Sequence, residues 1–293
     1  MNLVRIATRS SAQARTQASV IADELARIHV GLEVELVFVD TIGDQRRDVP
    51  LHTMGGQGVF VKEVQVAVLE GRADIAVHSA KDLPSAPADG LTIAAFGQRR
   101  DARDVLVGRS MNDLAPGATV ATGSVRRRAQ LRRLRPDLNF VELRGNIPTR
   151  LERIPNNGAI VMAAAALDIL GWSDRVSEYV SVDAMVPAVG QGCVAVECRT
   201  DDQVISELLM AIDHEPSRQA LERERAFLAE LGSGCSLPVG AFDDGATMRF
   251  YLASDDGTQH HQAHMATGHT ASHDELVEMA RQAARTARAA VTG

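Results

Sequence analysis

The first third of the chain alternates between short apolar runs and stretches with helical spacing. The runs predict strands at residues 3–7, 33–40, 74–78 and 91–96. Apolar residues recur every three or four positions over residues 18–28 and 61–70, which predicts helices. Strands that alternate with helices are typical of parallel sheets, so we predict an α/β unit here.

The same alternation resumes after a charged, irregular segment at residues 98–104. Strands are predicted at residues 105–107, 119–121, 139–143, 159–162 and 193–197, and helices at 124–134, 164–170 and 207–212. A glycine-containing junction at residues 187–192 precedes the last of these strands. We therefore expect two similar α/β lobes, joined by two crossings of the chain that form a hinge.

The last quarter has a different pattern. An amphipathic helix at residues 217–231 precedes a glycine-rich loop, two strands and a final helix, at residues 247–253, 259–265 and 274–291. These elements predict a small α+β domain. The expected division is residues 1–97 with 193–214, then 98–192, then 215–293.

Composition restricts the class of protein. A chain of 293 residues, of which 45% are apolar, is long enough for more than one packed core. It has no apolar run of membrane-spanning length and does not begin like a secretory signal. Three cysteines make a sparse, odd set, which favours a reducing compartment over a disulfide framework. We expect a cytoplasmic protein.

Charge is concentrated in the middle of this acidic chain. Residues 99–153 hold thirteen arginines, six acidic residues and no lysine. The planar guanidinium suits bidentate capture of carboxylates or phosphates. This stretch predicts a polyanionic partner, either a small molecule or a nucleic acid.

Chemically capable side chains follow the strand at residues 74–78. His78, Ser79, Lys81 and Asp82 come just before Pro84, which ends regular structure. Ligands of open α/β sheets bind beyond the carboxyl ends of strands, where Lys81 would place a cation beside a possible acid or base. The alternative is an ordinary solvated junction between strand and loop.

Three other strand ends carry arginines. Arg9 precedes serines that can cap a helix, Arg126 and Arg127 lie in the first turn of a helix after Ser124, and Arg144 follows a strand. Cations at a helix N-terminus oppose the helix dipole, so a bound anion would explain them. A helix that binds nucleic acid and a merely solvated face are the alternatives.

Cys235 lies between glycines and a proline, which predicts an exposed and reactive thiol rather than a buried one. A loop cysteine without a role is the alternative. Cys193 and Cys198 are expected to be buried in regular structure. Five histidines in the tail lack the converging spacing of metal ligands, so no metal site is expected. They are His260, His261, His264, His269 and His273.

Five motifs in register across the chain resemble the porphobilinogen deaminase family. They are Ile6-Ala7-Thr8-Arg9-Ser10-Ser11, Ala76-Val77-His78-Ser79-Ala80-Lys81-Asp82-Leu83-Pro84, Leu143-Arg144-Gly145-Asn146, Pro187-Ala188-Val189-Gly190-Gln191-Gly192 and Gly234-Cys235. The resemblance implies two periplasmic-binding-protein-like α/β lobes with a hinge and a small α+β C-terminal domain. It also implies a monomeric transferase of tetrapyrrole (heme) biosynthesis, which joins four porphobilinogen molecules head to tail into hydroxymethylbilane and releases ammonia.

The resemblance also implies roles for individual residues. Asp82 would be catalytic, and Cys235 would carry a dipyrromethane cofactor through a thioether. Residues implied to bind the cofactor are Ser79, Lys81, Thr122, Ser124, Arg126 and Arg127. Residues implied to bind porphobilinogen and the growing polypyrrole chain are Arg9, Ser11, Arg144, Arg150, Gln191 and Gly192. No nucleic acid or membrane partner is implied.

The chain departs from the family pattern at four positions. Thr53, Gln57 and Ile169 stand where the family commonly has a basic residue, and Ser233 replaces a glycine before Cys235. These differences bear on contacts to substrate and not on Asp82 or Cys235. A two-lobed anion-binding or regulator effector module without catalysis is the alternative function, and it would need neither a reactive thiol nor an acid at Asp82.

Overall fold

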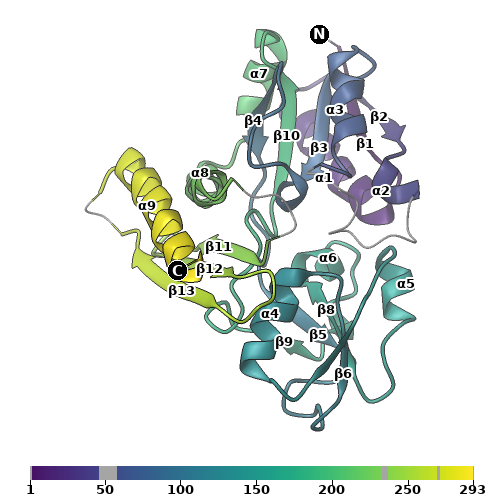
Figure 1. The fold of residues 1–293 in the computed structure, drawn as a ribbon. Helices are drawn as coiled ribbons and strands as arrows, with labels where there is room; N and C mark the ends of the chain where they lie inside the picture. Colours follow the sequence, from purple (N-terminus) through teal and green to yellow (C-terminus); the bar gives the residue numbers. More distant parts are fainter. Residues whose placement is uncertain (1, 46–57, 233–236, 269–270, 293) are drawn as a thin grey trace.

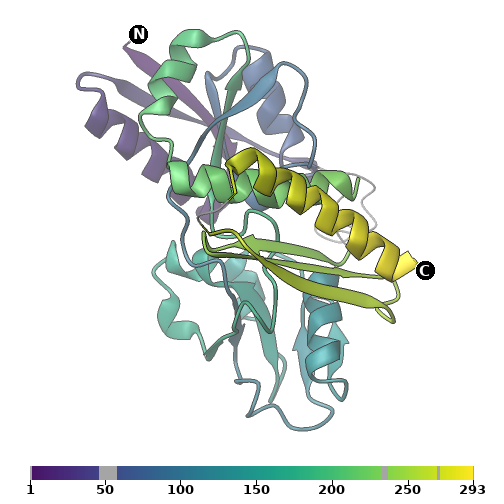
Figure 2. The ribbon, with the colours of Figure 1, turned by 90° about the vertical axis from the view of Figure 1, so that its left-hand side faces the viewer.

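The structure, a computed structural model, describes residues 2–45, 58–232, 237–268 and 271–292. Its strands form three separate sheets. Two sheets with their helices make a first and a second lobe, which lie one above the other in Figure 1. The third sheet and two long helices form a smaller unit beside the junction of the lobes (Figures 1 and 2).

The first lobe is a five-stranded sheet covered on both faces. Its strands follow the order β2 (Glu33–Val39), β1 (Leu3–Arg9), β3 (Ile75–Ser79), β10 (Val194–Arg199) and β4 (Leu91–Phe96). Its helices are α1 (Ala12–Ile28), α2 (Ile42–Gln45), α3 (Lys62–Leu69) and α7 (Gln203–Met210). Helices α1 and α7 share one apolar core with the sheet, and α3 shares another. Alternate side chains of β1 enter the two cores, Val4 and Ile6 on one side and Ala7 on the other.

The second lobe repeats this plan. Its strands follow the order β7 (Asn139–Val141), β6 (Thr119–Ala121), β8 (Ala159–Ala163), β5 (Asp104–Val107) and β9 (Glu178–Tyr179). Its helices are α4 (Val125–Leu134), α5 (Ile147–Leu151), α6 (Ala164–Asp168) and the 3₁₀ turn η3 (Ser173–Arg175). Helix α4 covers one face of the sheet, and α5 and α6 cover the other.

The prediction of parallel sheets is wrong for one strand of each lobe. Strand β10 pairs antiparallel with β3 and β4, and β5 pairs antiparallel with β8 and β9. Each is the strand by which the chain enters its lobe from the junction. Such a strand starts at the edge where β3 or β8 ends, so it must run the opposite way.

The third unit is an antiparallel sheet with helices on one face. Strands β11 (Val239–Asp243), β12 (Thr247–Ala253) and β13 (His260–Ala266) pair in sequence order, and α8 (Glu215–Glu230) and α9 (His273–Thr292) pack on them. The sequence pattern did not predict β11. With this unit, the expected fold class of two α/β lobes and a small α+β part is confirmed. Among the described residues, no helix is both long and apolar enough to cross a bilayer.

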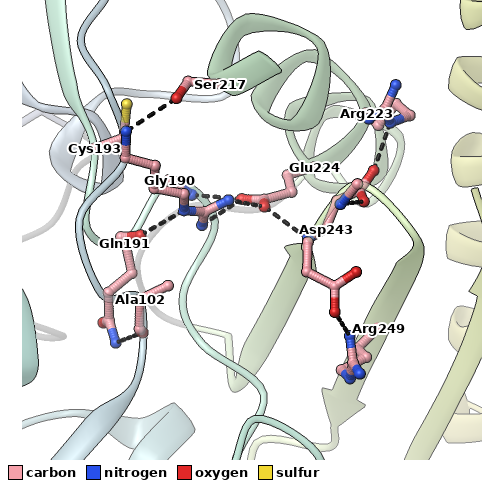
Figure 3. A network of polar contacts seen from close by, with 12 residues as sticks. Ala102, Gly190, Gln191, Cys193, Ser217, Arg223, Glu224, Asp243 and Arg249 are labelled. Atoms are coloured by element: carbon pink, nitrogen blue, oxygen red, sulfur yellow. Dashed lines mark hydrogen bonds and ion pairs between the residues drawn. The ribbon is translucent and has the colours of Figure 1, made fainter.

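A buried carboxylate ties the junction of the lobes to the third unit. The chain crosses between the lobes twice, at residues 97–103 (the first crossing) and 187–193 (the second crossing). Glu224 of α8 is fully buried and forms an ion pair with Arg99 on the first crossing. Its oxygens also accept the backbone N–H groups of Gly190 on the second crossing, at 2.8 Å, and of Asp243 in β11, at 2.9 Å (Figure 3). One side chain therefore contacts both crossings and the small sheet.

Candidate active site

A cavity of about 560 Å³ lies between the two lobes. Its wall is built where β1 and β3 of the first lobe and β6 and β7 of the second lobe end. The cationic residues in the wall are Arg9, Lys81, Arg126, Arg127, Arg144 and Arg150. Among the described residues, Asp82 is the one acidic residue that lines it. The cavity therefore suits a polyanionic ligand, and its described lining offers a single carboxylate for proton transfer.

The end of β3 turns directly into the 3₁₀ turn η2 (Ala80–Asp82), which carries Lys81 and Asp82. The Ala80 backbone N–H donates to the Cys193 carbonyl at 2.9 Å, and this bond fastens the turn to the second crossing. Gly190 packs against the same turn with a φ of 71°. A Cβ at Gly190 would lie 2.9 Å from the Ala80 carbonyl carbon, so the close approach requires glycine.

Lys81 is half-buried in a positive environment. Burial, together with the charges of Arg127 and Arg150, lowers the pKa of Lys81 to about 8, although Asp82 and Asp104 oppose this shift. Arg150 responds in the same way: burial lowers its pKa to about 10, with Arg127 contributing. A ligand carboxylate here would relieve this repulsion, because it would add the missing negative charge.

Arg126 and Arg127 are both buried at the start of α4 and both contact Asp104, the first residue of β5. Arg126 Nη1 donates to Asp104 Oδ2 at 2.7 Å, and Arg127 Nε donates to Oδ1 at 2.9 Å. Burial alone would raise the pKa of Asp104, but the two guanidiniums hold it well below its usual range. The sequence pattern did not single out Asp104, although a charged residue that opens the apolar run 105–107 is a usable signal.

Thr122 and Ser124 line the cavity and shape the turn between β6 and α4. Ser124 is the N-cap of α4, and its side chain accepts the Arg127 N–H at 3.4 Å. The Thr122 hydroxyl accepts the Ser124 N–H at 3.2 Å. The expected cap is confirmed, and it places the arginines in the first turn of the helix beside the cavity.

Arg9 and Ser11 approach from the first lobe. Arg9 ends β1, and its guanidinium lies over the Phe60 ring at 4.2 Å from the centroid. Ser11 caps α1 and accepts the Ala14 N–H at 3.3 Å. Phe60 also lines the cavity and was not expected from the sequence.

Arg144 and Arg150 approach from the second lobe. Arg150 Nε donates to the Gly145 carbonyl at 2.7 Å, which holds the arginine against the turn between β7 and α5. Burial lowers the pKa of Arg144, and Glu142 opposes this effect. Both arginines line the cavity, as does Ser79 at the end of β3.

Gln191 and Gly192 lie on the second crossing. The Gln191 side chain reaches the cavity wall, but its amide donates to Asp104 Oδ1 at 2.9 Å and to the Ala102 carbonyl at 2.7 Å. Gly192 does not line the main cavity. It borders a small adjacent cleft with Ser79, and its φ of 87° brings it against the Arg100 carbonyl.

Cys235 lies outside the described residues, as do Thr53, Gln57 and Ser233. Leu237, two positions after Cys235, lines the cavity together with Leu228 and Val239 of the third unit. Cys193 and Cys198 are free and buried, as expected. Within the described ranges, no group of three or more histidine, cysteine or acidic side chains could hold a metal ion.

His78 lines the cavity but also belongs to a buried polar group behind β3. Its Nε2 lies 3.0 Å from Glu197 Oε2 on β10. Gln65 of α3 donates to both oxygens of Glu197, at 2.9 and 3.1 Å. The sequence analysis named His78 among the chemically capable side chains after this strand, but it did not single out Glu197 or Gln65.

Comparison with known proteins gives matches over most of the chain. Residues 4–207 match the family model "Porphobilinogen deaminase, dipyromethane cofactor binding domain", and residues 219–288 match "Porphobilinogen deaminase, C-terminal domain". The porphobilinogen deaminase of Geobacter sulfurreducens is 42% identical over 88% of this chain and 84% of its own. That of Geobacter metallireducens is 41% identical over 87% of this chain and 83% of its own.

Solved structures give weaker similarity. The periplasmic VFT2 domain of Bordetella pertussis BvgS is 16% identical, with a TM-score of 0.42 over 72% of this chain and 86% of that chain. The family models and the curated relatives do not favour the alternative of a non-catalytic module. The chain belongs to the porphobilinogen deaminase family, whose members polymerise porphobilinogen into hydroxymethylbilane with a dipyrromethane cofactor.

Proposed function

We propose that Asp82 is the acid and base of this polymerisation and that the cations of the cavity hold the carboxylates of the pyrroles. The observation that carries the proposal is the makeup of the cavity wall, in which Asp82 is the one acidic residue among the described positions. Each pyrrole of porphobilinogen has an acetate and a propionate, so a growing chain is densely anionic. Arginine forks bind such groups in bidentate pairs.

The wall fits the dipyrromethane cofactor chemically. Lys81, Arg126 and Arg127 supply positive charge, and Ser79, Thr122 and Ser124 supply hydroxyl groups. When bound, the cofactor supplies the pyrrole carbon to which the first substrate is joined. Arg9, Ser11, Arg144 and Arg150 hold the substrate and the growing chain on the same wall.

Asp82 moves one proton in each direction during a cycle. Its carboxyl group gives a proton to the amine of porphobilinogen as the carbon–nitrogen bond breaks and ammonia leaves. The carboxylate that remains stabilises the cationic pyrrole. After the carbon–carbon bond has formed, the proton lost from the pyrrole ring returns to Asp82, and the group is ready for the next cycle.

Cys235 carries the cofactor through a thioether. Leu237, two positions later in the chain, lines the cavity, which supports attachment at Cys235. A covalent primer keeps the product chain on the enzyme between additions.

Gln191 and Gly192 act at the second crossing, where the lobes adjust to a lengthening chain.

The chain has three domains in this proposal. They are residues 1–97 with 193–214, residues 98–192 and residues 215–293. The three sheets support this division, since each draws its strands from one of these sets.

The protein acts as a cytoplasmic monomer on porphobilinogen, without nucleic acid or membrane. Arg126 and Arg127 are too deeply buried to contact a nucleic acid duplex, which supports a small ligand. The described cysteines are free thiols, in accord with a reducing compartment.

Intact-protein mass spectrometry tests the attachment. Freshly made protein should exceed the mass of its sequence by one dipyrromethane unit, and Cys235→Ser should have the unmodified mass. Cys198→Ser removes a buried thiol away from the cavity and should keep the added mass. A Cys235→Ser protein that kept the added mass would refute the assignment.

A further inference from the structure

Asp104 is a buried charge that the proposed chemistry does not use. It is fully buried and does not line the cavity, so it has no direct contact with a ligand there. A buried carboxylate is costly unless it is paired and hydrogen-bonded. The role of Asp104 therefore lies in its contacts with neighbouring side chains.

Both oxygens of Asp104 are used by residues of the cavity wall. Oδ2 accepts Arg126 Nη1 at 2.7 Å, and Oδ1 accepts Arg127 Nε and Gln191 Nε2, each at 2.9 Å. Arg127 Nη2 lies 2.8 Å from Oδ1, so this guanidinium meets the carboxylate with two of its nitrogens. One carboxylate thus fixes two adjacent guanidiniums and the amide from the second crossing.

Backbone carbonyls complete the orientation of the two arginines. Arg126 Nη1 also donates to the Val186 carbonyl at 2.6 Å, and Arg127 Nη1 donates to the Val161 carbonyl at 2.9 Å. A guanidinium has five N–H groups, so these contacts still leave donors of each arginine for a ligand. Without the carboxylate, two buried cations would face each other unpaired, which is strongly unfavourable.

We infer that Asp104 is the positioning residue of the cavity, whose carboxylate holds Arg126 and Arg127 in the orientation that captures the carboxylates of the pyrrole chain. The inference rests on the proposed function, because it takes that chain as the ligand. It adds a residue that never touches the ligand but sets the geometry of two that do.

Asp104 also affects the charge of Lys81. The charged groups that act on Lys81 are Arg127 and Arg150, which disfavour its proton, and Asp82 and Asp104, which favour it. Loss of the Asp104 charge should therefore shift the titration of Lys81 to lower pH. A substitution that keeps the negative charge at position 104 should leave this titration near its wild-type midpoint.

The test compares Asp104→Asn with Asp104→Glu and with Asp74→Asn as a matched control. Asp74 is a buried partner of Arg5 in the first lobe and does not line the cavity. Two quantities are measured on the full chain: the fraction that carries the dipyrromethane mass, and the pH midpoint of Lys81 acetylation by peptide mass spectrometry. The pH midpoint of Lys81 acetylation is measured in proteins that also carry Cys235→Ser.

Asp104→Asn should lower the cofactor-carrying fraction at least tenfold and move the Lys81 midpoint to lower pH. Asp104→Glu keeps the charge but displaces it, so it should lower the fraction and leave the midpoint near that of wild type. Asp74→Asn should change neither. Wild-type occupancy with an unchanged midpoint in Asp104→Asn would overturn the inference.

If Asp104→Asn does not fold, Asp104→Glu provides the test. Full cofactor occupancy in Asp104→Glu would exclude a positioning role. If wild-type protein itself lacks the added mass, the proposed attachment fails. The Lys81 midpoint still tests the effect of the Asp104 charge on Lys81 in that case, so the two failures are distinguishable.

Discussion

At the scale of single residues, the described part of the cavity wall holds one acid among several cations. Asp82 and Lys81 occupy one 3₁₀ turn, and the wall around them brings arginines from both lobes. In the proposed function, proton transfer and anion binding belong to different side chains, so their effects should be separable by substitution.

Replacement of Asp82 should abolish turnover but not binding. Asp82→Asn keeps the size of the side chain and removes the transferable proton, so turnover should fall by about 10²- to 10⁴-fold while the cofactor mass remains. Asp89→Asn removes an exposed acid that lies later in the same loop region of the sequence and does not line the cavity, so it is the control and should have wild-type turnover. Steady-state kinetics with porphobilinogen decides, and normal turnover of Asp82→Asn would refute the catalytic role.

The lowered pKa of Lys81, about 8, predicts weaker capture of the anionic cofactor in alkali. Above that pH Lys81 of the cofactor-free protein loses its charge, so the fraction that gains the dipyrromethane mass on incubation with porphobilinogen should fall, while Lys81→Arg should remove this fall because arginine stays charged. In the unfolded chain lysine keeps its proton to higher pH. This group therefore makes the free energy of unfolding increase between about pH 8 and 10.5. A cofactor-carrying fraction of wild type that does not change from pH 7 to 9 would contradict the account.

At the scale of elements, the turn after β3 depends on the close approach of the second crossing. Gly190→Ala would place a Cβ against the backbone of Ala80, in addition to the cost of about 1–2 kcal/mol for a left-handed backbone conformation. Gly171→Ala has a similar φ, 70°, and no atom within 4 Å of its Cβ, so it measures the backbone cost alone.

Urea denaturation and turnover should separate the two glycine variants. Gly171→Ala should lose about 1–2 kcal/mol of unfolding free energy and keep its activity. Gly190→Ala should lose more and also turn over more slowly, because η2 carries Asp82. Equal effects of the two substitutions on unfolding free energy and turnover would show that the close approach of Gly190 to Ala80 does not affect function.

Most elements could be predicted from the sequence because each has a local signal. Ser124 marks the start of α4, and the apolar run before His78 marks β3. The reversed direction of β5 and β10 could not be predicted, since direction depends on the path of the whole chain through two lobes. Strand β9, with two residues, is too short to have a pattern.

Only some of the residues at the cavity could be predicted from the sequence. The motifs, together with the arginines at strand ends, located Asp82 and most of the cations, which lie together in one wall. They did not locate Asp104 or Phe60, because these residues act through contacts to Arg126, Arg127 and Arg9 that exist only in the folded chain. Gln191 was expected to bind substrate, and its amide contacts to Asp104 emerge only from the tertiary structure.

At the scale of the whole molecule, Glu224 joins the two crossings to the third unit (Figure 3). Glu224→Gln should leave the largely covered side chain of Arg99, 11% exposed, without its counter-charge and lower the free energy of unfolding by about 3–5 kcal/mol. Glu222 lies on the same helix, α8, and forms a more exposed pair with His273 of α9. Glu222→Gln should therefore change the free energy of unfolding by less than about 1 kcal/mol. Denaturant unfolding measures both, and a similar small effect of Glu224→Gln would exclude this role.

The central claim is that this cavity builds a pyrrole chain on the protein itself. Its most direct test is the intact mass of the protein after brief exposure to limiting porphobilinogen. We predict a ladder above the cofactor-bearing mass, each step equal to one porphobilinogen less ammonia, with no step beyond the starting mass in Asp82→Asn. A wild-type mass that stays unchanged while substrate is consumed would contradict the account.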